Sequence, residues 1–138
     1  MINSVSCRIF DPRLGKEWPL PHRQTEYAAA LDLRAMLDDV LILQPGKVEL
    51  IGSGFGIHIA QSHVCAFILP RSGLGHKEGL VLGNGTGLID ADYQGELKIS
   101  AFNRSETPIV IKPGDRIAQL VFLPIVQPHL NWVNSFEE

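Results

Sequence analysis

The chain has 138 residues, of which 45% are hydrophobic and 20% are charged, proportions that are ordinary for a globular protein with one core. Its net charge of −3 argues against a nucleic-acid polymer as partner, because proteins that bind such polymers usually carry a basic excess. No apolar run approaches the roughly 18 residues that cross a membrane, and residues 1–8 lack the blocks of a signal peptide. We therefore expect a cytoplasmic protein.

Short apolar segments separated by turn residues follow one another along the chain. Alternating apolar and polar residues predict half-buried strands over residues 5–9, 28–35 and 55–59, because successive side chains of a strand face opposite sides. Continuous apolar runs predict further strands over residues 40–43, 64–69, 109–111 and 117–123, with a last short candidate at 131–133.

Helical spacing is scarce in this sequence. Residues 34–40 and 72–78 can each form a turn or two of helix, and Ser72 is the predicted N-cap of the second. About ten short strands with turn signals between them favour an all-β barrel or sandwich over alternating strands and helices. No repeat or linker interrupts the pattern, so we expect one domain over residues 1–138.

Neither the cysteines nor the histidines have the spacing of a metal site. Cys7 and Cys65 lie far apart in apolar, strand-like runs, and we expect both to be buried free thiols in a reducing compartment. Of the five histidines, only His58 and His63 are spaced so that they could meet. The glycine-rich residues 52–56 lack the last glycine and the helix of a dinucleotide-binding fingerprint.

Four polar stretches interrupt the apolar pattern. They are residues 31–35 with Asp32, 70–75 with Arg71 and Ser72, 83–96 with Asp90, and 114–120 with Arg116 and Gln119. A turn with an arginine, a hydroxyl and free backbone N–H groups, such as residues 70–75, suits a phosphate. Glycines over residues 83–87 let the backbone approach a flat ligand. We expect residues 88–89 and 97–99 to form a hairpin whose bend presents Asp90 to a water or a reacting group.

In order and spacing, these stretches resemble the motifs of the trimeric dUTP pyrophosphatases (dUTPases), most of all the bacterial enzymes. Two motifs are highly specific for this family: PRSGLG at residues 70–75 and GLIDADYQGE at residues 87–96. A third, GDRIAQL at residues 114–120, is specific when it occurs together with the other two. The similarity runs from about Cys7 to Phe122. The stretch with Asp32 matches less closely, because Ala30 stands where the family usually has glycine.

The resemblance implies a β-clip or jelly-roll-like barrel with at most one or two short helical turns. It implies a homotrimer with active sites at the subunit interfaces. It also implies Mg²⁺-assisted hydrolysis of dUTP to dUMP and pyrophosphate, a reaction that limits uracil incorporation into DNA and supplies dUMP for thymidylate synthesis. Neither a nucleic-acid polymer nor a membrane is an expected partner.

Carried over by position, the resemblance implies that Asp90 orients and deprotonates the water that attacks the α-phosphorus. It implies that Arg71, Ser72 and Gly73 hold the phosphates from the neighbouring subunit. Ser72 would lie near the α–β bridging oxygen, where the charge of the leaving group develops. Gln119 would add a further phosphate contact.

The resemblance implies no direct protein ligand for the metal. Asp32 would reach Mg²⁺ only through water, which fits an ion that keeps several waters and is held mainly by the substrate phosphates. Arg116 would support the side of the site where Gln119 contacts the phosphates.

The resemblance assigns base and sugar selection to the glycine-rich stretch. Asn84, with backbone groups at Leu88, Ile89 and Lys98, would pair with the uracil edge and exclude both cytosine and the 5-methyl group of thymine. Tyr93 would lie under the sugar and leave no room for a 2′-hydroxyl, so that UTP is rejected.

One departure from the family pattern leaves alternatives open. The family usually ends in a mobile, glycine-rich tail with an arginine and a phenylalanine, and this sequence stops at residues 134–138 before such a motif. Either the protein has a tail that this sequence does not include, which we favour because the other motifs are intact, or it has none. In the second case, a tail-less dUTP-binding or regulatory relative with little turnover is one alternative. A dCTP deaminase is another, although that family generally has Arg-Ser-Ser-Leu where residues 71–74 read Arg-Ser-Gly-Leu.

Overall fold

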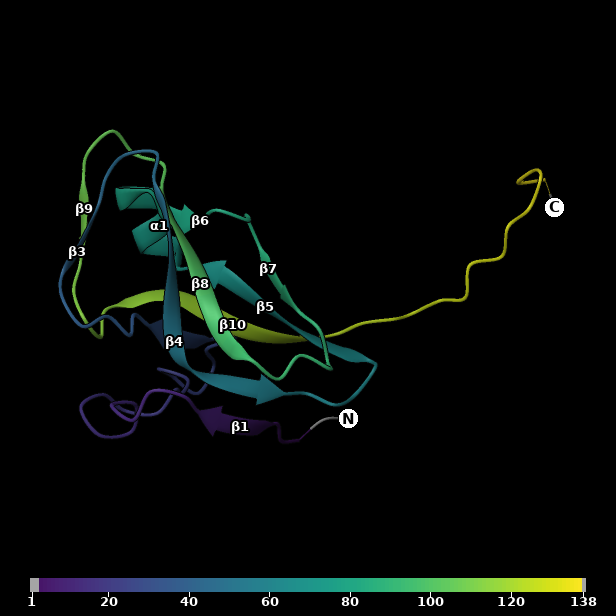
Figure 1. The fold of residues 1–138 in the computed structure, drawn as a ribbon. Coiled ribbons are helices and arrows are strands. Elements are labelled where there is room, and N and C mark those ends of the chain that lie inside the picture. Colours follow the sequence, from purple (N-terminus) through teal and green to yellow (C-terminus); the bar gives the residue numbers. More distant parts are fainter. Residues whose placement is uncertain (1–2, 138) are drawn as a thin grey trace.

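The computed structural model describes residues 3–137, which form ten strands and one short helix (Figure 1). The strands are β1 (Ser6–Ile9), β2 (Leu31–Arg34), β3 (Leu41–Leu43), β4 (Val48–His58), β5 (Val64–Pro70), β6 (Leu80–Leu82), β7 (Gly87–Ile89), β8 (Glu96–Asn103), β9 (Ile109–Ile111) and β10 (Arg116–Pro124). The helix is α1 (Ser72–Glu78), over the residues predicted for it. No helix of the described residues is long and apolar enough to cross a membrane.

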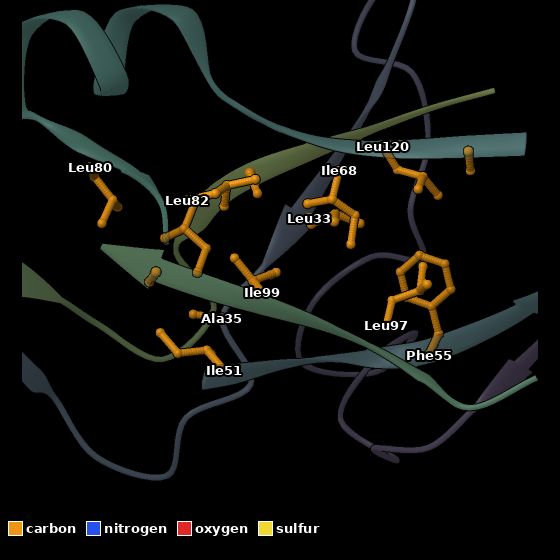
Figure 2. Close-up of a cluster of buried hydrophobic side chains, with 14 of the residues drawn as sticks. Leu33, Ala35, Ile51, Phe55, Ile68, Leu80, Leu82, Leu97, Ile99 and Leu120 are labelled. Atoms are coloured by element: carbon orange, nitrogen blue, oxygen red, sulfur yellow. The ribbon is translucent and has the colours of Figure 1, made fainter. Parts of the chain in front are cut away.

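Two four-stranded antiparallel sheets enclose the core. Their strand orders are β1-β4-β8-β6 and β2-β10-β5-β7, and β3 pairs with β9 in a small separate sheet. Figure 2 shows Leu33, Ile68 and Leu120 of the second sheet clustered with Leu97 and Ile99 of the first. Burying each side chain of this size contributes roughly 1.5–3 kcal/mol. The expected all-β, jelly-roll-like fold is confirmed.

The predicted hairpin between residues 88–89 and 97–99 is wrong. β7 pairs with β5, whereas β8 pairs with β4 along one edge and with β6 along the other. Residues 90–95 instead cross from the sheet of β7 to the sheet of β8, and β6 covers β8 only over residues 101–103. β7 is the last strand of its sheet, so its outer edge has no partner strand within residues 3–137.

Two helix predictions also need correction. Residues 35–40 form no helix, because the Ala35 N–H donates to the Asp115 carbonyl and the Ala35 carbonyl accepts the Gly114 N–H. Arg71, not Ser72, is the N-cap of α1, and no side chain caps this helix. The strand β5 thus runs directly into α1 without a polar cap.

The other differences concern strand limits and burial. β4 begins at Val48 rather than at residue 55, because a bulge between Gly52 and Gly56 breaks the expected alternation. Residues 131–133 form no strand, and the segment after β10 extends away from the sheets (Figure 1). Cys65 is buried as expected, but Cys7 is exposed because it lies on β1, at the edge of its sheet.

One close approach ties the loop after β1 to the turn before β10. Gly114 has a φ of +84°, and a Cβ at this position would overlap the indole of Trp18. The Arg13 guanidinium lies 5.4 Å from the centre of the same ring and 2.7 Å from the Asp11 carboxylate. Hydrogen bonding by Arg13 lowers the pKa of Asp11. The indole is therefore fixed by a cation and by a glycine backbone.

We expect Gly114→Ala to lower the free energy of unfolding by about 2–4 kcal/mol, because the methyl group overlaps the indole and the left-handed backbone is strained. Gly46→Ala is the matched control. Gly46 has a φ of +75°, but an added Cβ would meet nothing within 4 Å, so the loss should be about 1 kcal/mol. Urea unfolding at fixed protein concentration measures both variants, and equal losses would contradict a role for the indole contact.

Candidate functional site

A cavity of about 580 Å³, which we call the Arg71 cavity, is lined by both polar and apolar residues and includes residues from three of the four predicted stretches. The predicted site residues that line it are Asp32 of β2, Arg71, Ser72 and Gly73 after β5, and Gln119 of β10. They meet because β10 lies between β2 and β5 in the sheet. The register sets Gln119 opposite Asp32 on one side and level with the end of β5 on the other.

Asp32 organises the cationic groups beside this cavity. Its two carboxylate oxygens lie 3.3 Å from Arg71 Nε and 3.2 Å from Arg116 Nη1, and its side chain is 14% exposed. Arg71 also donates to the Arg116 carbonyl at 3.3 Å. One carboxylate therefore holds together two guanidinium groups that would otherwise repel each other.

Ser72 and Gly73 leave room for a ligand. Ser72 is exposed at the start of α1 and makes no capping hydrogen bond, and a Cβ at Gly73 would meet nothing within 4 Å. Gln119 is oriented by a hydrogen bond from its Nε2 to the Pro70 carbonyl at 2.8 Å, which uses one of its two N–H groups. Guanidinium, hydroxyl and amide donors thus converge in a form that suits linked phosphates.

Asp90 lies in a different cavity, of about 510 Å³, with His58, Gln61 and Asp92 among its lining residues. Its carbonyl accepts the Tyr93 N–H at 3.2 Å and so closes the turn after β7. Because Asp90 is exposed, water can reach its carboxylate. No local pattern in the sequence indicates His58 as a neighbour of Asp90, because His58 comes from β4.

Asp90 and the Arg71 cavity lie at opposite ends of β5. The register of β7 on β5 sets Ile89 opposite Ala66, so Asp90 is level with Cys65, whereas Arg71 follows the last residue of the strand. Arg71 is six residues after Cys65, and a strand rises roughly 3.3 Å per residue, so Asp90 and Arg71 lie about 20 Å apart along β5. Figure 1 shows α1 near one end of β5 and the β7–β8 connection near the other.

The other predicted site residues surround the turn before β7 and the connection after it. Asn84 is exposed in that turn, and Leu88 is exposed on the edge strand β7. Ile89 is half-buried and packs against the core. Tyr93 is 43% exposed, whereas Lys98 lies on β8, in the opposite sheet. None of these five residues lines the Arg71 cavity.

Glu96 is a residue of this region that the sequence reasoning missed. Its carbonyl accepts the Tyr93 hydroxyl at 2.8 Å, and its carboxylate accepts the Gly54 N–H at 3.0 Å. The signal in the sequence is the glycine spacing of residues 52–56, which does not fit a dinucleotide-binding fingerprint but leaves space for a close contact.

Comparison with known proteins identifies close relatives. The sequence model of the dUTPase family matches residues 16–138. A deoxyuridine 5′-triphosphate nucleotidohydrolase of Xanthomonas oryzae pv. oryzae is 58% identical over 133 residues, which cover 96% of this chain and 86% of the relative. The protein of the same name from Xanthomonas campestris pv. campestris is 57% identical over 136 residues, which cover 99% and 90%.

Solved structures share the fold. The dUTPase of Staphylococcus bacteriophage 80alpha has a TM-score of 0.84 at 26% identity, over 99% of this chain and 100% of that chain. The dUTPase from phage phi11 of S. aureus has a TM-score of 0.83 at 25% identity, over 98% and 99%. A structure of a variant of the phi11 enzyme describes the coordination of a structural Mg(II) ion.

We expect Asp32→Asn to lower the free energy of unfolding by about 1–3 kcal/mol, because a neutral amide cannot compensate two adjacent guanidinium groups at a partly buried position. Asp39→Asn is the matched control, since Asp39 is exposed and forms no ion pair among the described residues. Urea unfolding at fixed protein concentration compares the two. Similar small losses in both would mean that the ion pairs of Asp32 add no net stability.

Proposed function

This chain belongs to the dUTPase family and is a dUTP diphosphatase, and we propose that Asp90 of one copy acts together with the Arg71 cavity of another. The main observation in support is the separation of these two groups along β5. A general base must lie within hydrogen-bond reach of the proton that it takes, directly or through one water. A base about 20 Å from the phosphate-binding donors does not meet that condition within one copy.

In the proposed reaction, Asp90 orients a water molecule and takes a proton from it as the water oxygen attacks the α-phosphorus. The bond from this phosphorus to the α–β bridging oxygen breaks, and pyrophosphate leaves. Arg71 and the Ser72 hydroxyl stabilise the charge that develops on the bridging oxygen and the leaving phosphates. The Gly73 backbone and the Gln119 amide add donors to the same phosphates.

We assign base and sugar selection to the residues around β7. The unpaired outer edge of β7 at Leu88 and Ile89, the Asn84 amide and the backbone of Lys98 pair with the uracil edge. Cytosine would bring its amino group against a donor, and an unpaired buried donor costs roughly 1–3 kcal/mol. The 5-methyl group of thymine finds no room beside this edge. The exposed ring of Tyr93 packs under the deoxyribose and excludes a 2′-hydroxyl.

A shared site of this kind requires copies that present two different surfaces to one another. Such head-to-tail contacts generate a ring when the rotation between copies closes. Three copies would give three equivalent sites, each with Arg71 from one copy and Asp90 from its neighbour. We therefore propose a homotrimer.

Mg²⁺ suits this site as an ion held mainly by the substrate phosphates. The described residues contain no cluster of three or more His, Cys, Asp or Glu side chains that could hold a metal, and both oxygens of Asp32 already lie against arginines. The remaining lone pairs of Asp32 are available to the water shell that Mg²⁺ usually keeps. When bound, the ion neutralises phosphate charge.

The alternatives drawn from the sequence are not favoured. The relatives that match most of this chain are named as nucleotidohydrolases, which argues against a dUTP-binding protein with little turnover. The dUTPase family match over residues 16–138 argues against a dCTP deaminase. Cytoplasmic localisation stays a prediction.

We expect Asp90→Asn to lower kcat for dUTP by about 10²- to 10⁴-fold, because the amide cannot take the proton of the attacking water. Binding should persist, so dUTP should still raise the melting temperature of the variant. Asp92→Asn removes the same charge two residues away and should change kcat far less. Full activity in Asp90→Asn would remove this residue from its role.

Mixed oligomers test the shared site. Asp90→Asn and Arg71→Ala should each be nearly inactive. When equal amounts of the two variants are unfolded and refolded together, the mixture should recover about a quarter of the wild-type activity. The reason is that one site in four then pairs an intact Asp90 with an intact Arg71 of the neighbouring copy. Pyrophosphate release from dUTP measures the recovery. The control is Asp90→Asn mixed with the variant that carries both Asp90→Asn and Arg71→Ala, because no site in that mixture has an intact Asp90. Activity no higher than in that control would contradict a site formed by two copies.

A further inference from the structure

The connection between β7 and β8 is held by contacts that the reaction itself does not require. Tyr93 folds back over its own turn, because its hydroxyl donates to the Glu96 carbonyl at 2.8 Å and its N–H donates to the Asp90 carbonyl at 3.2 Å. The residue nevertheless remains 43% exposed. The ring therefore has a fixed polar end and still presents surface to a ligand.

The side chain of Glu96 anchors this turn to the neighbouring strand. Its Oε2 accepts the Gly54 N–H at 3.0 Å, inside the bulge of β4. Gly54 is buried and has a φ of +86°, a conformation that glycine adopts without strain. No lysine or arginine of the described residues forms an ion pair with Glu96, so the carboxylate serves the backbone of β4.

Three glycines clear the space for these contacts. A Cβ at Gly52 would lie 2.5 Å from Glu96 Oε2, and a Cβ at Gly95 would lie 2.6 Å from the Tyr93 hydroxyl oxygen. A Cβ at Gly56 would overlap the carbonyl oxygen of Gly95. Glycine in a strand weakens it and often marks a close approach of another backbone. The β4 bulge and the β7–β8 connection therefore interlock through these positions.

We propose that Glu96 is a positioning residue that fixes the Tyr93 ring and thereby sets the discrimination between dUTP and UTP. The inference rests on the proposed function, in which Tyr93 packs under the deoxyribose. Glu96 lines neither the Asp90 cavity nor the Arg71 cavity, and its carboxylate is directed to Gly54, so it acts through Tyr93. Loss of the carboxylate leaves the Gly54 N–H without its acceptor, so the start of β8 is no longer held against β4. The Glu96 carbonyl, which accepts the Tyr93 hydroxyl, lies at this start.

The first measurement is the ratio of kcat/KM for dUTP to kcat/KM for UTP. Glu96→Ala should lower this ratio by about tenfold, chiefly because UTP becomes a better substrate. Glu96→Gln keeps an oxygen acceptor for Gly54 and should retain the ratio. Gly52→Ala displaces the carboxylate while keeping Glu96, so it should lower the ratio as well, and it tests the proposal if Glu96→Ala does not fold.

A matched control separates positioning from general loss of stability. Ile111→Ala removes a buried side chain of β9. β9 pairs with β3 in the small sheet and not with β4, β7 or β8. It should lower the melting temperature and leave the substrate ratio unchanged. Tyr93→Ala is the positive control, because it removes the ring that Glu96 is proposed to hold.

The ring can also be followed without substrate. The chain contains two tyrosines, and Tyr27 is 94% exposed, so protein labelled with 3-fluorotyrosine should give two ¹⁹F NMR signals with Tyr27 as an internal reference. We expect Glu96→Ala to shift the Tyr93 signal toward that of an exposed tyrosine. Glu96→Gln should leave it in place.

The outcomes are distinguishable. A lowered ratio and a shifted Tyr93 signal in Glu96→Ala, with both retained in Glu96→Gln, support the proposal. A lower melting temperature in Glu96→Ala with an unchanged ratio and an unchanged Tyr93 signal overturns it, provided that Tyr93→Ala lowers the ratio. An unchanged ratio in Tyr93→Ala itself overturns the role of Tyr93 in the proposed function, and the discrimination role of Glu96 with it.

Discussion

The register of β5 with its two neighbours is the constraint on which the site depends. β10 pairs along one edge of β5 and brings Gln119 to the end that carries Arg71. β7 pairs along the other edge and leaves Asp90 at the opposite end. Because strand pairing is rigid and its rise per residue is fixed, small movements of side chains cannot bring the two groups together. A single constraint of the sheet thus separates the proposed phosphate-binding donors from the proposed base.

At each end of β5, a carboxylate holds other groups in place. Asp32 binds Arg71 and Arg116 beside the Arg71 cavity, and Glu96 binds the backbone of Gly54 beside the turn that carries Tyr93. The first arrangement is ionic and the second depends on glycines that leave space for close contact. Groups held in advance lose less freedom when a ligand binds, so in the proposed function both ends contribute to the selection of one nucleotide.

The sequence predicted the strand-rich fold and α1, because alternation and turn residues are local signals. Its motifs also identified the residues that converge on one cavity, including Asp32, Arg71 and Gln119. It did not predict that β7 and β8 belong to different sheets, since strand pairing depends on distant partners and not on the bend between them. The bulge of β4 was missed for the same reason, because Glu96 fills the space beside Gly52 and binds the Gly54 N–H, both more than 40 residues earlier in the chain.

A crystal structure of this protein with a non-hydrolysable α,β-imido analogue of dUTP tests the central claim most directly. The account predicts that each nucleotide lies between two copies, with its phosphates against Arg71 and Ser72 of one copy. Its α-phosphorus and sugar should lie against Asp90 and Tyr93 of the other. A nucleotide bound by Arg71 and Asp90 of the same copy would contradict the account, because it would require β5 and β7 to pair in a different register.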